Sequence, residues 1–517
     1  MCSKFARRLV TCACKALSPM NGNSGGECTS LIFSLQSNSR LCVCGGLLTT
    51  VTFLGGIDEI GGNCFLVEDE DTRLLLDFGM RYSVRGKYFE EYIKPRSSAG
   101  LIDVLTLGLV PDRLEFYRKD LLEMIGKKSA PEPYLDGVLL SHVHYDHSAN
   151  ISFLDERVPV YTSQITALYA KVLTETGQRN IETELYDFKT RPLTNPRMEA
   201  TPRIFKTFDG ESRFKVGSIT VHSYPVDHSV AGATAFLLEC SDSTLLYTGD
   251  LRFHGPLGAH TRGSIEKIAE QKPDVMLCEG TRVDETTTSS ENDVKTKSLQ
   301  TASKCKGLIV ADFAPRDVFR LSTFHSIAKE LGRKLLIMKQ DAYLINQLRE
   351  VPLLRDLLPP VDDASILVYV ERKGSGTYRD VDYRTWEREF LSLPNAVQSD
   401  YVQKNQSKIM ACMGFFDINE LIDVKPKAGS IYIESTSEPH NEEQEIDVER
   451  LNNWLDFFGL TKFHFHSSGH ASASDLRFMM QTVKPKCLIP IHTEQPGQFA
   501  RMHQNVKHVK LGQKVKV

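Results

Sequence analysis

Short apolar runs separated by glycine and acidic turns begin at about Thr49 and continue to about residue 284. Runs of this length, bounded by turn residues, are typical of consecutive β-strands. Two longer stretches with helical spacing, RLEFYRKDLLEMIGK and SQITALYAKVLTET, lie between them. The pattern therefore predicts a strand-rich α/β domain. Its expected strands are TTVTFLGG, NCFLVED, TRLLLDFG, DGVLLS, PVYTS, ITVHSYPVDHS, TAFLLEC and TLLYTGD.

The rhythm changes at about Glu285, where a polar stretch precedes a regular alternation of strands and helices. This alternation predicts a second α/β unit inserted into the first. Its last expected helix, DVERLNNWLDFFGL, leads into two histidine-bearing segments, FHFHSSGHAS and KCLIPIHTEQPG. We therefore expect an extension over residues 1–48, a first domain over 49–284 that resumes over 460–517, and an inserted domain over 285–459.

Composition places few limits on function. The chain has 517 residues, 41% hydrophobic and 25% charged, with 62 basic against 66 acidic residues and a net charge of -4. Without a basic excess, a nucleic-acid partner is neither indicated nor excluded, because a basic channel can lie on a mildly acidic protein. No apolar run reaches the roughly 18 residues of a membrane-spanning helix, so no membrane association is expected.

The first 48 residues differ from the rest in carrying half of the 12 cysteines. The other six are scattered singly, which favours reduced thiols in a cytoplasmic protein. Cys12 and Cys14, like Cys42 and Cys44, have C-x-C spacing and not the C-x2-C spacing usual for zinc. The opening SKFARRLVTCACKALS resembles an organellar transit peptide, although a disordered tail or an upstream start codon would also explain it.

The decapeptide SHVHYDHSAN (141–150) crowds four metal-capable side chains, those of His142, His144, Asp146 and His147. On a loop leaving a buried strand, the two alternating histidines face the same side. The helix start that follows brings Asp146 and His147 to a second point. The spacing therefore predicts two ligand pairs for two neighbouring metal ions.

Four ligands do not complete two sites, and three further candidates follow apolar strands: His228 in SYPVDHS, Asp250 in LLYTGD and His492 in CLIPIH. A carboxylate such as that of Asp250 can bridge two metal ions, which an imidazole does not do readily. The other histidines without comparable context are interpreted as ordinary polar residues: His222, His254, His260, His325, His440, His464, His503 and His508.

These motifs resemble the metallo-β-lactamase superfamily. SHVHYDH matches its signature loop, Asp77 in LLLDFG its first acidic motif, and the downstream His228 and TGD its third and fourth motifs. The inserted α/β unit after VMLCEG, together with SGHAS and IPIHTE, narrows the likeness to the β-CASP branch of nucleases. LGGIDEIGGN, STSEPHNEE and HSSGHASASDL look most like ribonuclease J and its archaeal relatives.

The resemblance implies a metallo-β-lactamase αββα sandwich with an inserted α/β β-CASP domain, and a role for each matching residue. His142, His144 and His228 would hold one Zn²⁺, Asp146, His147 and His492 the other, and Asp250 would bridge them, with Mn²⁺ or Mg²⁺ as alternative ions. Asp77 would orient the ligand loop from behind. The implied catalytic residues are Asp146, Glu279 and His470, and the implied substrate-binding residues are His466, Ser468 and His470.

The function implied is hydrolysis of single-stranded RNA by a two-zinc-activated hydroxide, with 5′ to 3′ exonuclease activity preferred and endonuclease activity as a second mode. A homodimer is compatible with the likeness. Three alternatives remain. A small-molecule metallo-hydrolase (of a thioester, lactone or lactam) would not explain the insert or SGHAS. A DNA-repair nuclease of this branch usually lacks a histidine at the position of His492, and a non-catalytic scaffold would have lost ligands.

Overall fold

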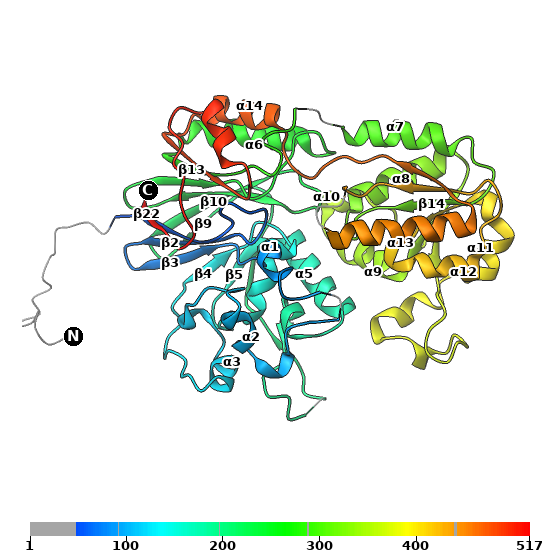
Figure 1. Ribbon diagram of the computed structural model, residues 1–517, viewed down its shortest axis with the longest axis horizontal. Helices are drawn as coiled ribbons and strands as arrows, with labels where there is room; N and C mark the ends of the chain where they lie inside the picture. Colours follow the sequence, from blue (N-terminus) through cyan, green and yellow to red (C-terminus); the bar gives the residue numbers. More distant parts are fainter. Residues whose placement is uncertain (1–47, 91, 196, 287–288, 439–441) are drawn as a thin grey trace, which may run out of the picture. The chain divides into compact units, whose positions relative to one another are not determined.

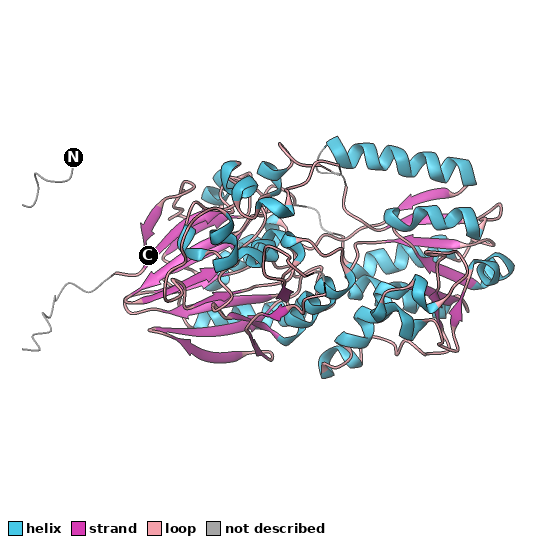
Figure 2. Cartoon of the chain, turned by 90° about the horizontal axis from the view of Figure 1, so that it is seen from below, coloured by secondary structure: helices cyan, strands magenta, loops and turns pink. Residues whose placement is uncertain are grey.

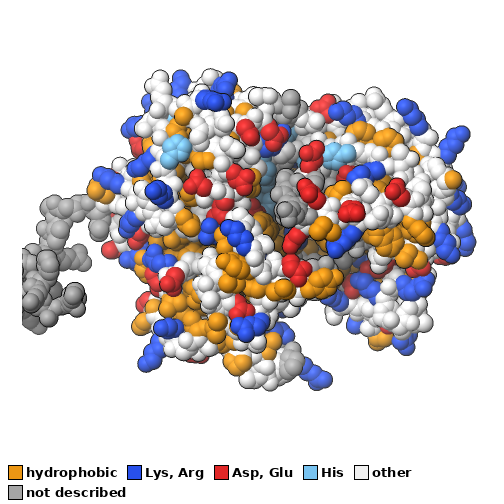
Figure 3. Space-filling model, in the orientation of Figure 1, with side chains coloured by type: hydrophobic (Ala, Val, Ile, Leu, Met, Phe, Trp, Pro, Cys, Tyr) orange, Lys and Arg blue, Asp and Glu red, His pale blue; other side chains and the backbone are white. Residues whose placement is uncertain are grey.

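The structure is a computed structural model that describes residues 48–90, 92–195, 197–286, 289–438 and 442–517. The predicted N-terminal extension lies outside the described residues except for Leu48, and so does His440. Acidic and basic side chains are interspersed on the face of the molecule shown in Figure 3, as the nearly balanced composition predicts.

The first sheet changes from antiparallel to parallel pairing at β3. Because carboxyl ends of parallel strands meet at one edge, Asp77 after β3 and His142 after β4 are brought to the same edge of this sheet. In spatial order its strands are β22 (Lys514–Lys516), β1 (Thr50–Gly55), β2 (Cys64–Asp69), β3 (Thr72–Leu76), β4 (Gly137–Leu139), β5 (Val160–Ser163) and β8 (Phe205–Phe208).

The second sheet stacks on the first (Figure 2). An apolar core between the two sheets contains Phe53 and Phe65 from the first and Phe236, Tyr247 and Leu277 from the second, all fully buried. In spatial order its strands are β21 (Cys487–Ile491), β13 (Val275–Glu279), β12 (Thr244–Tyr247), β11 (Thr234–Glu239), β10 (Ile219–Pro225) and β9 (Ser212–Val216).

Helices cover the outer face of each sheet. Helix α5 (Gln164–Thr176) packs on the first sheet, and α6 (Gly258–Glu270) lies beside α14 (Ala473–Val483) over the second (Figure 1). The four layers form the predicted αββα sandwich, which is confirmed. Shorter elements of this part are α1 (Tyr82–Arg85), α2 (Ile102–Thr106), α3 (Lys119–Met124), α4 (Tyr145–Ser148), β6 (Asp187–Phe188) and β7 (Thr201–Pro202).

One predicted helix is wrong. RLEFYRKDLLEMIGK is broken into a 3₁₀ turn at Leu114–Phe116 and the short helix α3. The break falls at Tyr117 and Arg118, both in extended conformation. The buried Arg118 guanidinium turns to Asp120, at 2.8 Å, and to the carbonyl of Ser152, so tertiary contacts override the local helical pattern.

The insert is built on a third sheet whose strand pairs are all parallel. Its spatial order is β17 (Ala396–Val397), β16 (Ile366–Tyr369), β15 (Lys334–Met338), β18 (Ile409–Cys412), β14 (Ile309–Asp312), β19 (Ile431–Glu434) and β20 (Thr461–His464). Strand β20 lies in this sheet although its residues were predicted to follow the insert, because they pair with β19.

Apolar helices bury both faces of this sheet, as a parallel sheet requires. Phe324 of α8 and Ile345 of α9 pack on one face, and Val402 of α11 and Leu455 of α13 on the other. The helices of the insert are α7 (Glu291–Ala302), α8 (Val318–Glu330), α9 (Lys339–Leu348), α10 (Pro352–Arg355), α11 (Ser399–Asn405), α12 (Leu421–Val424) and α13 (Glu442–Phe458).

Within the described part of the chain, none of the helices combines the length and apolar character needed to cross a membrane. The six cysteines in that part all carry free thiols.

Candidate metal centre

The loop after β4 carries the histidine cluster and is held in place by the loop after β3. Backbone hydrogen bonds join Phe78 N to the His147 carbonyl at 2.8 Å and Met80 N to the Tyr145 carbonyl at 2.9 Å. Gly79 lies so close to this loop that a Cβ there would come within 1.6 Å of the Asp146 carbonyl oxygen. Only glycine allows the two loops to approach this closely.

Three histidines form the first group. Nδ1 of His144 lies 3.1 Å from Nε2 of His142 and 3.1 Å from Nε2 of His228, which comes from the loop after β10. Nitrogens bound to one tetrahedral zinc ion at about 2.0 to 2.1 Å would be spaced at roughly 3.3 Å. The three side chains therefore have the spacing of ligands that share one ion.

Four residues form the second group: Asp146, His147, Asp250 and His492, each offering one ligand atom within 4.8 Å of the others. Oδ2 of Asp146 lies 3.2 Å from Nε2 of His492, and Oδ2 of Asp250 lies 3.1 Å from Nε2 of His147. The same Asp250 oxygen is 3.7 Å from Nε2 of His142 and 3.9 Å from Nε2 of His228. Asp250 thus lies between the two groups.

Two buried polar atoms of this centre lack hydrogen-bond partners in the protein, and a bound metal ion would satisfy them. In the described chain, Nε2 of His147 and Oδ1 of Asp250 are buried without a hydrogen-bond partner, which is costly unless a missing group satisfies them. Burial, and then the charge of His147, lower the pKa of His142 well below its ordinary value. Burial likewise lowers the pKa of His144 to about 4. Both imidazoles are therefore neutral at pH 7, which is the form that binds metals.

Asp77 supports the centre from the carboxyl end of β3. Its carboxylate lies 2.6 Å from Nδ1 of His147 and accepts hydrogen bonds from the Ser141 backbone, Ser141 Oγ and the Tyr247 hydroxyl. A hydrogen bond from Nδ1 leaves Nε2 of His147 free to face the centre. Asp77 is fully buried and has a left-handed φ of 55°, and backbone strain of this kind is typical of functional sites.

Glu279 and His470 meet beside the second group. Glu279 ends β13 and is fully buried, and its Oε1 lies 3.4 Å from Nδ1 of His470. Nδ1 of His470 is also 3.9 Å from Oδ2 of Asp250. Burial alone would lower the pKa of His470, but Glu279 and then Asp250 raise it to about 9. The structure thus brings together all seven predicted ligands with the predicted pair Glu279 and His470.

His466 and Ser468 lie on the segment between β20 and α14, and their side chains bond to backbone atoms and not to the ligand groups. Nδ1 of His466 donates to the Ser435 carbonyl at 3.1 Å, and Ser468 Oγ accepts from the His470 backbone at 3.2 Å. Neither residue belongs to the ligand groups found among the described residues.

A buried ionic network that sequence reasoning missed holds the same segment from behind. Arg252 and Arg320 both pair with Glu291, at 3.2 and 2.7 Å. Their guanidinium groups also donate to the carbonyls of Ser468 and Ser467, at 3.3 Å each. The only sequence signal was the position of Arg252, two residues after Asp250 in TGDLRF.

Two histidines complete this support. Nε2 of His254 donates to the Ser468 carbonyl at 2.9 Å, and Nδ1 of His228 donates to the Gly469 carbonyl at 2.6 Å. His254 was interpreted as an ordinary polar residue, and its structural role is to hold the segment that carries His470. His228 therefore links the three-histidine group to this segment.

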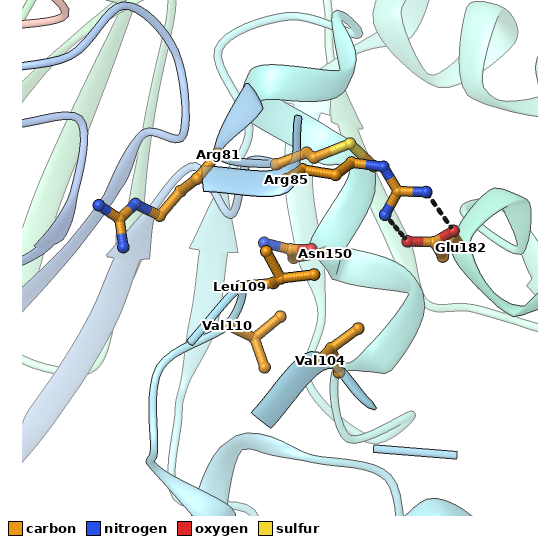
Figure 4. Close-up of a pocket in the computed structure, with 8 residues that line it drawn as sticks. Arg81, Arg85, Val104, Leu109, Val110, Asn150 and Glu182 are labelled. Atoms are coloured by element: carbon orange, nitrogen blue, oxygen red, sulfur yellow. Dashed lines mark hydrogen bonds and ion pairs between the residues drawn. The ribbon is translucent and has the colours of Figure 1, made fainter. Parts of the chain in front are cut away.

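A small pocket lies at the base of the loop after β3 and is lined in part by Asn150, Arg85 and Glu182 (Figure 4). Asn150 also donates to the Gly79 carbonyl. Arg85 closes one side through paired hydrogen bonds to Glu182, at 2.5 and 3.1 Å. The remaining lining includes Val104, Leu109 and Val110, and none of the predicted site residues. The pocket therefore belongs to the framework of the loop.

Comparison with protein families identifies two domains. Residues 57–290 match the metallo-beta-lactamase superfamily, and residues 461–506 match a Zn-dependent metallo-hydrolase RNA specificity domain. The chain thus contains a metallo-β-lactamase domain and a metallo-hydrolase RNA specificity domain, and these matches and the His/Asp cluster support a metal cofactor. Its inserted parallel sheet and its curated relatives match the β-CASP branch and the ribonuclease J group.

Curated relatives match over most of the chain. Ribonuclease J of Mycoplasma genitalium is 21% identical over 471 residues, which is 89% of this chain and 70% of the relative. Ribonuclease J of Pyrococcus abyssi is 23% identical over 454 residues, 85% of this chain and 89% of the relative. A crystal structure of a protein of unknown function from Enterococcus faecalis has a TM-score of 0.68 and 22% identity, covering 91% of this chain and all of the other. It supports the fold alone.

Proposed function

We propose that the chain is a metal-dependent ribonuclease that hydrolyses phosphodiester bonds of single-stranded RNA at a centre for two zinc ions. The observation that carries this proposal is the position of the Glu279 and His470 pair, 3.4 Å apart, directly against the Asp250 carboxylate between the two ligand groups. A match to an RNA specificity domain over the segment that contains His470 supports RNA as the substrate.

The proposed ligand assignment follows the two groups. His142, His144 and His228 hold one ion, Asp146, His147 and His492 hold the other, and Asp250 bridges them. The bridging role is supported by Oδ2 of Asp250, which lies between 3.1 and 3.9 Å from nitrogens of both groups. Asp77 acts through His147 and contacts no ion.

In the proposed mechanism, the metal ions and the side chains have different roles. When bound, two zinc ions supply an activated water and neutralise charge on the phosphate. His470 is placed to hold a proton for the departing 3′-oxygen, because its ring stands at the edge of the centre. Glu279 keeps that ring oriented through Nδ1, and Thr281 Oγ1, 2.9 Å from Nδ1 of His492, orients the His492 ring so that its Nε2 faces Asp146 and the centre.

The proposed domain limits follow sheet membership. Residues 49–284 and those after β20 form the metallo-β-lactamase domain, and the insert extends from 285 through His464 because β20 pairs with β19. A homodimer, compatible with the resemblance, would have twice the mass of the 58.2 kDa chain in light scattering.

The test compares RNA substrates that differ only in their ends. Purified, zinc-loaded protein is incubated with linear 5′-monophosphorylated RNA, linear 5′-triphosphorylated RNA and circular RNA. A 5′ to 3′ exonuclease will degrade the monophosphorylated RNA fastest, and cleavage of the circle will add an endonuclease mode. His470→Ala should lower kcat by about 10²-fold or more, as loss of a positioned proton donor does.

The matched control is His508→Ala, since His508 is exposed and outside the centre. It should retain full activity. If the wild-type protein leaves all three RNAs intact but hydrolyses a thioester, lactone or lactam, the small-molecule hydrolase is the correct function. If it hydrolyses neither class while binding RNA, the non-catalytic alternative holds.

A further inference from the structure

Arg316 has a strained backbone at a position close to the metal centre. It lies in the loop between β14 and α8, with a left-handed φ of 80°. Residues other than glycine rarely adopt this conformation, which persists only where surrounding contacts enforce it. Here the Arg316 carbonyl accepts two hydrogen bonds, each at 2.9 Å. One comes from the hydroxyl of the buried Tyr169 of α5, and the other from the Val318 backbone N–H.

This backbone directs the guanidinium toward the ligand loop. The Arg316 guanidinium carbon lies 5.3 Å from the centroid of the Tyr145 ring. Tyr145 stands between His144 and Asp146, which belong to different ligand groups. Arg316 is therefore a neighbour of the centre through the Tyr145 ring, although it comes from the insert.

The charge of Arg316 has no counterpart in the part of the protein that the structure describes. No hydrogen bond or ion pair from its guanidinium is formed there, and the side chain is only partly buried. Arg252 and Arg320, by contrast, are buried, and their guanidinium groups bind Glu291 and backbone carbonyls. A partly exposed guanidinium without a carboxylate, beside a phosphodiester-hydrolysing centre, is suited to an anionic ligand.

We propose that Arg316 is a substrate-positioning residue that binds a backbone phosphate of the RNA strand next to the bond that is cut. The inference rests on the proposed ribonuclease function and names a contact outside the ligand groups and the Glu279 and His470 pair. A guanidinium presents two parallel donors to phosphate oxygens. The Tyr145 ring supports its face and fixes its direction.

The experiment measures RNA binding as a function of salt. Zinc-loaded His470→Ala protein, which binds RNA without rapid cleavage, is titrated with a 5′-monophosphorylated single strand, alone and combined with Arg316→Ala or Arg316→Lys. Loss of one phosphate contact should lower the slope of log K against log salt by about 0.7. Affinity should fall roughly 10-fold for alanine, and lysine should keep the slope with weaker binding. In the active protein, Arg316→Ala should raise KM more than it lowers kcat.

Lys486→Ala is the matched control for loss of one positive charge. Lys486 is 79% exposed and precedes β21, at the opposite end of the strand from His492. This variant should keep the wild-type salt slope and KM. Zinc content and melting temperature should be the same in all variants. If Arg316→Ala loses zinc or unfolds, Arg316→Gln, which keeps much of the side-chain length, provides the same comparison.

The outcomes separate the two proposals. If the wild-type protein cleaves RNA but the Arg316 variants share its salt slope and KM, the role of Arg316 is wrong and the ribonuclease function stands. A fall in affinity with an unchanged slope would also contradict a phosphate contact. If the wild-type protein cleaves no RNA, the proposed function itself fails.

Discussion

Asp77 shows how one side chain organises a metal centre that it does not enter. Its carboxylate receives hydrogen bonds from Ser141 and Tyr247 and faces Nδ1 of His147 at 2.6 Å. The contact selects the tautomer of His147 that presents Nε2 to the centre. Removing the charge should therefore weaken the proposed metal site that contains His147 while all its ligands remain.

Asp77→Asn tests this role. Affinity for zinc, measured by competition with a chelator, should fall by about 10- to 100-fold. Asp71→Asn is the control, because Asp71 is exposed in the turn before β3. Equal zinc affinity in the two variants would contradict the role of Asp77.

Asp312, at the end of β14, predicts a pH dependence of stability. Burial, together with the charges of Glu434 and Asp417, raises its pKa from 3.8 to about 7, and the Tyr432 hydroxyl, which donates at 2.6 Å, opposes this rise. The folded state binds this proton more tightly than the unfolded state. Its contribution to stability is therefore complete below pH 3.8 and is lost as the pH rises through about 7.

Asp312→Asn removes this titration and keeps an oxygen for Tyr432. Relative to the wild type, the melting temperature of the variant should be higher at pH 8 than at pH 5. A difference that is constant across this range, in scans of both proteins in the same buffers, would show that Asp312 does not titrate there.

At the scale of elements, the segment between β20 and α14 takes its conformation from residues outside it. Arg252 follows β12 and Arg320 lies in α8, and their guanidinium groups hold the backbone at Ser468 and Ser467. Glu291, which begins α7, pairs with both guanidinium groups. His470 follows two residues later. The position of His470 is therefore determined by contacts from the loop after β12 and from helices α7 and α8.

Glu291→Gln should break these contacts, because it leaves two buried guanidinium groups with less compensating charge. The free energy of unfolding should fall by about 3 kcal/mol or more. Glu285→Gln is the control, since Glu285 is 53% exposed in its pair with Arg282 and should cost less than about 1 kcal/mol. Denaturant titration measures the free energy of unfolding of both variants. Similar decreases in the two would contradict a stabilising role for the buried ionic network.

Whether a site residue can be predicted from the sequence depends on whether its context is local or arises only in the folded chain. His142, His144, Asp146 and His147 are predictable because they are local, and His228, Asp250 and His492 because each follows an apolar strand. Glu291 and Arg320 could not be predicted, since their meaning depends on elements that meet only in the folded chain. The α/β class and the inserted unit were predictable from the pattern of strands and helices, and the αββα layers only from the family resemblance. The break at Arg118 could not be predicted, because it depends on the distant carbonyl of Ser152.

At the scale of the whole molecule, the metal centre joins the carboxyl ends of strands from both sandwich sheets. His142 follows β4 of the first sheet, while Asp250 and His492 follow β12 and β21 of the second. Metal binding should therefore stabilise the contact between the two sheets as well as the loops.

Zinc should raise the melting temperature of metal-free protein. Free zinc at 100 times its dissociation constant stabilises a site by about 2.7 kcal/mol. His142→Ala should lose most of this response and His508→Ala none of it, as measured by thermal scans with and without a chelator. An unchanged melting temperature in wild-type protein on adding zinc would argue against a metal site that spans the sheets.

The insertion between β13 and β21 also determines when each ligand group is complete during synthesis. His144 and His228 are 84 residues apart, whereas Asp146 and His492 are 346 apart. At about 5 to 20 residues per second, His228 follows His144 after roughly 4 to 17 s, and His492 follows Asp146 after roughly 17 to 70 s. Under the proposed two-ion assignment, a nascent chain would therefore be able to capture one ion on the ribosome, well before the ligands for the other exist.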